Sequence, residues 1–289
     1  MMGIYEWAAY FKFRNTAGKS DKKRDAGLKF ADNLEVIKDI LYGPHALDLY
    51  RLKNSQGKLP VLVSCHGGGY VYGDKELYSF YTAEFAQFGF AVVNFDYSLA
   101  PKKRFPTPII ETNMVMEWIV QNQEKYGLDA SNIVMIGDSA GAQIASQYAV
   151  CATNSEYAEI MNLKIPAITL RALSLGCGMY KIVRDPQSPT KVLGDIYLTK
   201  NTSQYGEQID VLKYVNKDYP PSFLCSSPGD FLLENMEPMA EIIRSQGVEA
   251  VTKIYGKENT YHVFFCDIRS DLAKECNKDQ AEFLKSKLG

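Results

Sequence analysis

The feature that most constrains this chain is an alternation of short β-type runs with longer helical patterns, which begins near residue 34. Parallel neighbouring strands need a crossover connection, so this order predicts a mostly parallel sheet of about eight strands flanked by helices on both faces. Ala46–Leu52 lies too close to its neighbours for helical crossovers, and we therefore expect the start of the sheet to be antiparallel. The runs are Val36–Tyr42, Ala46–Leu52, Leu59–Cys65, Phe90–Asp96, Asn132–Ile136, Ile168–Leu175, Ser222–Ser227 and Glu249–Tyr255, and the helical patterns lie near 78–89, 108–126, 139–152, 234–247 and 270–287.

Three segments stand outside this alternation. Four apolar residues near the start recur at the spacing of one helix face and predict a helix that packs on the rest of the molecule: Ile4, Trp7, Ala8 and Phe11. The mixed charges of Lys19–Asp25 indicate a solvated loop or helix end rather than a binding patch. More than forty residues separate the run ending near Leu175 from the one beginning near Ser222, and a loop of that length is usually a lid or an insertion. With no internal repeat and no Pro/Gly/Ser linker, residues 1–289 are expected to form a single domain.

Charge and cysteine content narrow the classes of function. The 32 Lys and Arg against 34 Asp and Glu give a net charge of −2, without the basic excess that nucleic-acid binding needs. The longest apolar stretches, such as Ile133–Ile136, fall far below the ~20 residues that cross a bilayer. There is no secretory signal pattern at the start, and the six cysteines contain no Cys-x-x-Cys pair. We expect a cytoplasmic protein with reduced thiols, no metal, no cofactor, and neither nucleic acid nor membrane as a partner.

The strongest local signal is Gly137-Asp138-Ser139-Ala140-Gly141, between the apolar run Ile133–Ile136 and a helical pattern. A Gly-x-Ser-x-Gly sequence between a strand and a helix is typical of a nucleophile elbow, in which small neighbours permit the strained turn that exposes the serine hydroxyl. The alternative is an ordinary turn with Ser139 as the helix N-cap. The context favours Ser139 as a catalytic nucleophile.

Three successive glycines close the run Leu59–Cys65, in the sequence His66-Gly67-Gly68-Gly69. Because glycine has no Cβ, their amides can approach a substrate and supply oxyanion donors beside the amide of Ala140. His66 is expected to brace this loop by hydrogen bonding. A phosphate-binding loop would require a following Gly-Lys-Ser/Thr, and the one Gly-Lys-Ser of the chain has Phe13 in place of the first glycine of that pattern.

Chain order selects the remaining partners of a hydrolytic triad. In this architecture the nucleophile precedes the acid and the acid precedes the base, and His262 is the one histidine that follows Ser139. Asp230 comes directly after the run Ser222–Ser227, from which a carboxylate can reach the His262 ring and hold its tautomer. Glu234 is a weaker rival. Four other acids fall in the irregular insertion, where nothing fixes them against the sheet: Asp185, Asp195, Asp210 and Asp218.

The two glycine motifs, together with Asp96-Tyr97-Ser98-Leu99-Ala100-Pro101 and Phe105-Pro106, resemble the hormone-sensitive-lipase branch of the α/β-hydrolase superfamily from about residue 34 onward. The resemblance implies an α/β-hydrolase fold and a serine carboxylesterase with Ser139, Asp230 and His262 as its triad. It also implies Gly67, Gly68 and Ala140 as oxyanion donors. A small cap would come from about 1–30 and about 178–218. This chain departs from the family pattern at Val263, where a glycine often follows the base.

These observations favour an esterase that hydrolyses small, short-chain (acetyl-like) acyl esters through an acyl-enzyme. Four rings near the motifs are expected to keep the acyl pocket narrow: Tyr70, Tyr72, Phe264 and Phe265. The alternatives are an amidase, formamidase or peptidase on the same triad, and a small-ligand-binding protein without catalysis. The expected partner is a small ester substrate, and the resemblance suggests a homodimer.

Overall fold

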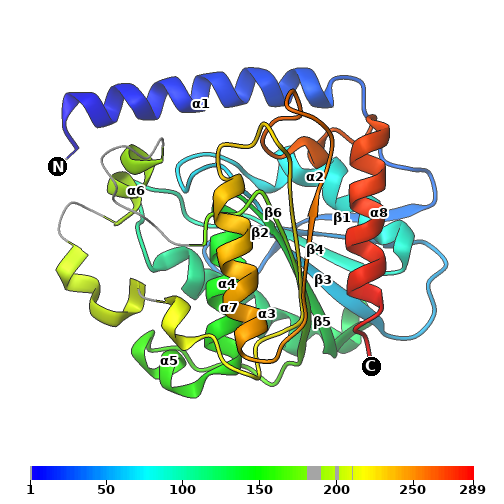
Figure 1. Ribbon diagram of the computed structural model, residues 1–289. Helices are drawn as coiled ribbons and strands as arrows, with labels where there is room; N and C mark the ends of the chain where they lie inside the picture. The colour runs from blue at the N-terminus through cyan, green and yellow to red at the C-terminus, as the bar shows by residue number, and fades with distance from the viewer. Residues whose placement is uncertain (1, 181–189, 199–201, 210) are drawn as a thin grey trace.

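A computed structural model describes residues 2–180, 190–198, 202–209 and 211–289, and an eight-stranded sheet forms its centre (Figure 1). The strand order is β1-β2-β4-β3-β5-β6-β7-β8. The β1–β2 and β2–β4 pairs are antiparallel and all other pairs are parallel, which confirms the predicted sheet and its antiparallel start. The strands are β1 (Leu34–Leu41), β2 (Ala46–Leu52), β3 (Leu59–Cys65), β4 (Ala91–Phe95), β5 (Leu128–Asp138), β6 (Leu170–Gly176), β7 (Ser222–Ser226) and β8 (Ala250–Ile254).

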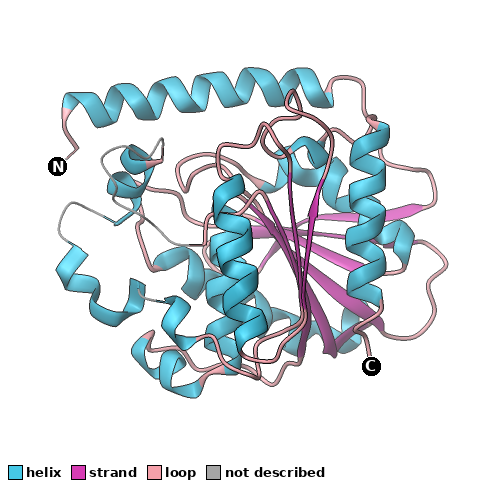
Figure 2. Cartoon of the chain, viewed as in Figure 1, coloured by secondary structure: helices cyan, strands magenta, loops and turns pink. Residues whose placement is uncertain are grey.

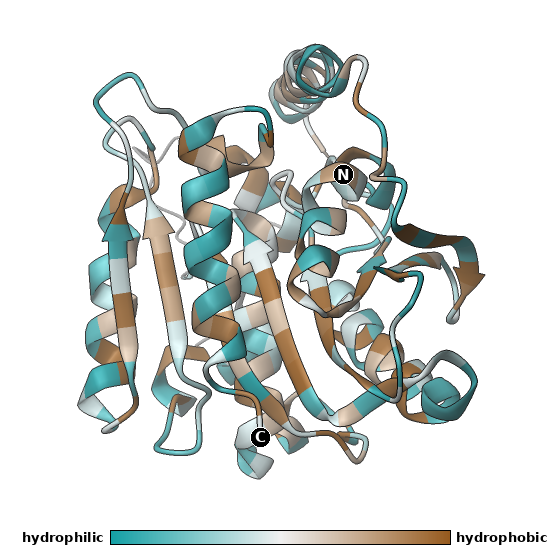
Figure 3. Cartoon of the chain, turned by 90° about the vertical axis from the view of Figure 1, so that its right-hand side faces the viewer, coloured by the Kyte–Doolittle hydropathy of each residue, from teal (hydrophilic) through white to brown (hydrophobic). Residues whose placement is uncertain are grey.

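Helices cover both faces of this sheet, as Figure 2 shows. On one face lie α3 (Thr107–Tyr126), α4 (Ala140–Thr153) and α7 (Met236–Ser245), and on the other lie α2 (Lys75–Glu84) and α8 (Asp271–Lys285). Successive side chains of a strand point to opposite faces, so Val61 and Val63 join one apolar cluster while Leu62 joins the other. A strand buried on both faces has apolar residues at nearly every position, and the central strands in Figure 3 show this pattern.

Helix α1 (Ile4–Asp25) is much longer than the predicted Ile4–Phe11 segment and lies above the carboxyl ends of the parallel strands (Figure 1). The prediction that the apolar face of Ile4, Trp7 and Phe11 packs on the rest of the molecule is wrong. These side chains are 91%, 41% and 61% exposed. Lys19–Asp25 is the last part of this helix, as one of the two expectations for it allowed.

The insertion before β7 contains helical segments that the sequence patterns do not predict. These are α6 (Lys191–Leu198) and the 3-10 segments η2 (Thr202–Ile209) and η3 (Val211–Tyr214), and a short helix α5 (Ser155–Ile160) precedes β6. The remaining 3-10 segments are η1 (Phe85–Phe88), η4 (Leu233–Asn235) and η5 (Phe264–Cys266). None of the helices in the described ranges is both long and apolar enough to span a membrane.

Candidate active site

Ser139 occupies a tight turn between the end of β5 and the start of α4. Its backbone has φ +52° and ψ −117°, which residues other than glycine rarely adopt. The two flanking positions have no room for a side chain. A Cβ on Gly141 would lie 2.0 Å from the Cys65 carbonyl oxygen, and a Cβ on Gly137 would lie 2.5 Å from the Gly141 carbonyl oxygen. The Ser139 amide donates to the Gly176 oxygen at 3.0 Å, which fixes the turn against β6. The geometry is therefore that of a nucleophile elbow.

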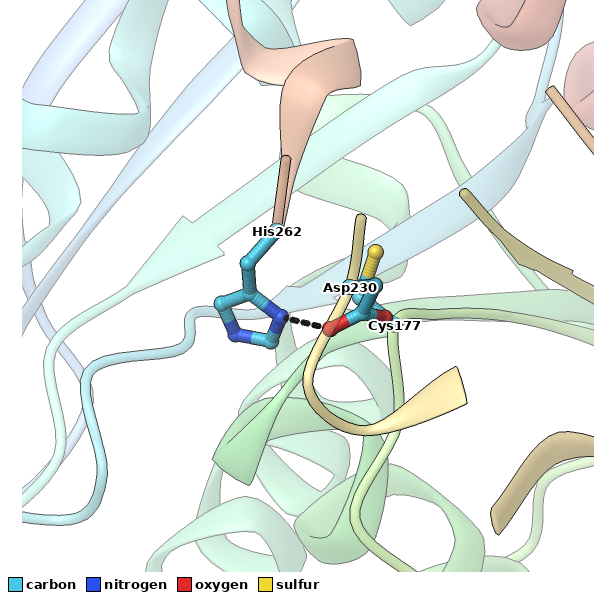
Figure 4. A group of neighbouring side chains, drawn as sticks. All are labelled: Cys177, Asp230 and His262. Carbon is cyan, nitrogen blue, oxygen red and sulfur yellow. Dashed lines mark hydrogen bonds and ion pairs between the residues drawn. The ribbon is translucent and has the colours of Figure 1, made fainter. Parts of the chain in front are cut away.

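Asp230 and His262 meet as a hydrogen-bonded pair just beyond β7. The His262 Nδ1 atom lies 2.7 Å from Asp230 Oδ1, as Figure 4 shows. Asp230 also accepts from the Leu232 amide at 3.0 Å and from the Ser226 hydroxyl at 2.5 Å. Burial alone would raise the pKa of Asp230, but the hydrogen bonds from His262, Ser226 and Leu232 outweigh it and lower that pKa below its usual range. The carboxylate therefore stays ionised at neutral pH and can orient the imidazole.

The rival acids are placed elsewhere. Glu234 is exposed in η4, Asp195 pairs with Lys191 within α6, and Asp218 is exposed beside Lys217. Asp185 and Asp210 lie outside the described residues. Asp230 is thus the predicted acid that the structure brings to His262.

The glycine loop lies beside the elbow. His66 Nδ1 is 2.7 Å from the Gly67 oxygen, and the ring stacks on Tyr97 at 4.1 Å between centroids, in agreement with its predicted bracing role. Burial lowers the pKa of His66 to about 4, so the ring is neutral. Gly68 and Gly69 have φ of +112° and +59°, and their amides donate to none of the residues that the structure describes.

The Gly67 amide is engaged differently. It donates to Asp138 Oδ1 at 3.1 Å, while the Tyr78 hydroxyl donates to Asp138 Oδ2 at 2.7 Å. Asp138 is buried directly before the nucleophile, and burial raises its pKa to about 6. Because one N–H group cannot serve two acceptors fully, the prediction of Gly67 as an oxyanion donor does not fit this geometry. Sequence reasoning missed that Asp138 binds the Gly67 amide. The one sequence feature that pointed to it was the presence of an acidic residue inside the elbow motif.

Ser139 and His262 open on one cavity of about 220 Å³. Tyr70 and Tyr72 line it as predicted, but Phe264 and Phe265 are absent from its wall. The ring of Phe265 instead packs on Gly176 and on Tyr81 behind the site. Sequence reasoning missed other lining residues, namely Phe231, whose ring lies 4.4 Å from that of His262, and the α1 residues Phe13, Ala17, Ser20, Asp21 and Arg24.

Polar contacts fasten α1 over this cavity. The Arg24 guanidinium pairs with Asp21 at 2.8 Å and Asp25 at 2.7 Å, and it donates to the Leu77 oxygen of α2 at 2.7 Å. The Tyr72 hydroxyl of the glycine loop donates to Asp21 Oδ2 at 2.8 Å. The charged end of α1 is thus part of the cavity wall, whereas the sequence had indicated a solvated segment.

Two clusters among the described residues combine enough ligand atoms to be considered for a metal ion. Asp39, Asp48 and Glu76 surround the Lys75 ammonium, which lies within 3.1 Å of each and already supplies a cation. In the second cluster, Cys177, Asp230 and His262, the histidine and the carboxylate are hydrogen-bonded to each other (Figure 4). The donor sets therefore fit an internal ion pair and a hydrogen-bonded acid–base pair better than a metal centre.

Fold and site together define the class of an α/β hydrolase with a serine nucleophile elbow. A model of the BD-FAE family matches residues 47–238, and the chain belongs to that family. Acetyl esterase of Salmonella schwarzengrund is 24% identical over 246 residues, which cover 79% of this chain and 72% of that protein. Versiconal hemiacetal acetate esterase of Dothistroma septosporum is 31% identical over 134 residues, covering 46% of this chain and 40% of that protein. The chain spans 30–40% of the first curated relatives that it matches.

Solved structures agree on the fold. Esterase B of Lactobacillus rhamnosis superposes with a TM-score of 0.89 at 20% identity, covering 98% of this chain and 95% of that chain. A bacterial heroin esterase superposes with a TM-score of 0.78 at 20% identity, covering 96% and 91%. At these identities the likeness establishes the α/β-hydrolase fold. The resemblance noted in the sequence is confirmed.

Proposed function

We propose that this chain is a serine carboxylesterase that cleaves small esters of short-chain acids. The observation that carries the proposal is that Ser139 and His262 open on one cavity, with Asp230 hydrogen-bonded to the imidazole behind it. The relatives support it, since they include an acetyl esterase and a versiconal hemiacetal acetate esterase. A purely ligand-binding protein would need no acid aligned behind a histidine at the cavity.

In the proposed reaction, the Ser139 hydroxyl attacks the ester carbonyl while His262 Nε2 takes its proton. Asp230 stabilises the imidazolium through Nδ1. The tetrahedral intermediate collapses, the C–O bond to the alcohol breaks, and His262 returns the proton to the leaving alkoxide. Water then attacks the acyl-serine with His262 again as base, which releases the acid and restores the Ser139 hydroxyl.

The oxyanion donors that we propose are the amides of Gly68, Gly69 and Ala140. Ala140 is the first residue of α4, so no helical carbonyl precedes it to accept its N–H. Gly68 must be glycine, because a Cβ there would lie 2.0 Å from the backbone carbonyl oxygen of Tyr72. Gly69 replaces Gly67 in this set because Asp138 occupies the Gly67 amide.

Residues 1–289 are proposed to act as one domain whose cap includes α1 and α6. Phe13 of α1 and Leu193 of α6 line the cavity from above the sheet. Part of the expected cap segment, about 178–218, falls outside the described residues, and the contribution of 1–30 comes from the later turns of α1.

Hydrolysis of p-nitrophenyl acetate with and without a serine-directed fluorophosphonate tests the proposal. We expect turnover by the wild type, stoichiometric labelling and complete inhibition. The matched control is Ser146→Ala, because Ser146 lies in the same helix α4 away from the cavity, and we expect this variant to be labelled and inhibited like the wild type. Labelling of the Ser139→Ala variant, or hydrolysis that resists the inhibitor, would contradict the assignment of Ser139.

A further inference from the structure

The backbone directly after the proposed base is strained. Val263 has φ +51° and ψ +36°, in the left-handed region. A β-branched residue is a genuine outlier there, because its Cβ substituents collide with the backbone. Since Val263 is joined to His262, any relaxation of its backbone would swing the imidazole. Something in the surroundings must hold this conformation.

Two contacts hold it: the Val263 oxygen accepts from the Cys266 amide at 3.1 Å in the turn that follows, and the Val263 amide is held by Cys177. This residue follows β6, is fully buried and itself has φ +47°. Its own amide donates to the Cys225 oxygen of β7 at 2.7 Å, which fixes it to the sheet. The Val263 amide donates to the Cys177 sulfur at 3.3 Å. Figure 4 shows the thiol beside Asp230, on the side away from the free edge of the His262 ring.

The chemistry of the thiol suits a link between these groups. Burial, together with the neighbouring Asp230 carboxylate, raises the pKa of Cys177 well above its usual range, so the sulfur keeps its proton at neutral pH. A protonated thiol can donate to the carboxylate while its lone pair accepts from the Val263 amide. The sulfur and the facing atoms of Asp230 and His262 all lie within 4.8 Å of one another.

We infer that Cys177 is a positioning residue of the site, whose thiol ties the strained backbone after His262 to the sheet and to Asp230 and thereby aims the imidazole at Ser139. The inference rests on the proposed function, because it assigns a task within that same triad. Cys177 touches no substrate in this scheme and acts only through His262 and Asp230.

Removal of the thiol should impair the chemical step. We expect Cys177→Ala to lower kcat by roughly 10- to 100-fold with little change in KM, since a small displacement of a catalytic group costs that much. Cys177→Ser keeps a donor and an acceptor and should retain more activity than the alanine variant. The matched control is Cys151→Ala in α4, which removes a buried thiol away from the cavity and should leave kcat unchanged.

A double-mutant cycle separates positioning from packing. Glycine adopts a positive φ without strain, so in a Val263→Gly background the backbone after His262 needs no tether. We therefore expect Cys177→Ala to cost less than about threefold in kcat when Val263 is also glycine. An equal loss in both backgrounds would overturn the inference, because a cavity in the core does not depend on residue 263. If the alanine variant does not fold, the same comparison is made with Cys177→Ser, and an equal loss is again the contrary result.

One readout does not depend on ester hydrolysis. The proton between His262 Nδ1 and Asp230 should give a downfield NMR signal that is absent in His262→Gln. We expect this signal to broaden or vanish in Cys177→Ala and to return in the double variant. A signal unchanged by Cys177→Ala would overturn the positioning role. Inactivity of the wild type toward every ester, with the signal still dependent on Cys177, would instead refute the proposed function alone.

Discussion

At the scale of single residues, the site is built on backbone conformations that most residues avoid. The positive φ of Ser139 costs roughly 1–3 kcal/mol, and the close packing of Gly137 and Gly141 around it keeps the turn in place. That strain lifts one hydroxyl above the carboxyl ends of the strands, where His262 faces the same cavity.

Ser139→Ala should leave the fold intact and nearly abolish hydrolysis. Loss of a triad nucleophile in a comparable enzyme lowers kcat by about 10⁶, and the residual rate comes from the oxyanion donors. Rates measured on p-nitrophenyl acetate, with circular dichroism to check folding, test this. Retention of a tenth of the wild-type activity by a folded variant would be incompatible with the mechanism.

Asp138 should make the protein less stable as the pH rises. A carboxyl whose pKa is raised on folding stabilises the folded state while it is protonated, and that contribution is lost as the pH passes from about 4 through about 6. The ionised, buried group then costs at most ~3 kcal/mol. Asp138→Asn lacks this ionisation, so its free energy of unfolding relative to wild type should increase between pH 4.5 and pH 8.

Urea unfolding at pH 4.5 and pH 8 measures the difference in free energy of unfolding between Asp138→Asn and wild type. Asn loses one of the hydrogen bonds that Asp138 accepts, and this loss changes the difference by the same amount at both pH values. The surface change Asp32→Asn serves as the control and should show no such trend with pH. A constant difference between Asp138→Asn and wild type across this range would contradict the raised pKa of Asp138.

Sequence alone proposes the residues whose expected role follows from chain order. Ser139, Asp230 and His262 come from motifs or from their order along the chain, and the structure brings Asp230 to His262 as expected. The engagement of Gly67 by Asp138 could not be predicted, because it depends on how two distant turns approach each other. The same holds for the contact between the Val263 amide and Cys177, which joins segments 86 residues apart.

At the scale of elements, α1 shows the limit of hydrophobic periodicity. Its apolar positions near the start point to solvent, while a mixed stripe of residues four and three apart faces the cavity: Phe13, Ala17, Ser20 and Arg24. Polar groups from other parts of the chain hold this stripe against the site, so its position cannot be predicted from the local sequence of α1. The central strands β3 to β7, which are mostly buried on both faces, were by contrast predictable from their own composition.

Arg24→Ala should loosen α1 from the site. The change removes three polar contacts and leaves the Asp21 and Asp25 carboxylates without their cation, which we expect to cost roughly 1–3 kcal/mol of stability. It should also raise KM, since Asp21 and Arg24 line the cavity. Thermal unfolding and p-nitrophenyl acetate kinetics report these two effects. The exposed Lys12→Ala on the same helix is the control, and equal behaviour of the two variants would argue against the anchoring role of Arg24.

At the scale of the whole molecule, the volume of the cavity limits the acyl group that the proposed esterase is expected to accept. The cavity of about 220 Å³ is smaller than the roughly 300–1,000 Å³ of pockets that hold drug-sized ligands. Each added methylene that fits gains ~0.8 kcal/mol, and chains that overfill the space lose more than they gain. We expect kcat/KM for p-nitrophenyl esters to be highest for acetyl to butyryl groups and to fall by octanoyl. An optimum at eight carbons or beyond would contradict a narrow pocket.

The position of α1 also bears on how the chain assembles during its synthesis. Residues 4–25 precede the sheet in the sequence, yet their polar partners lie later in the chain, at Val71, Tyr72 and Leu77 and at Arg269, which donates to the Arg24 and Ala26 oxygens. The last of these leaves the ribosome some 245 residues after Arg24. The full set of contacts that holds α1 can therefore form only after the later parts of the chain have folded. Helix α1 is thus made before the sheet, but it can complete its docking over the cavity only after Arg269 has been made.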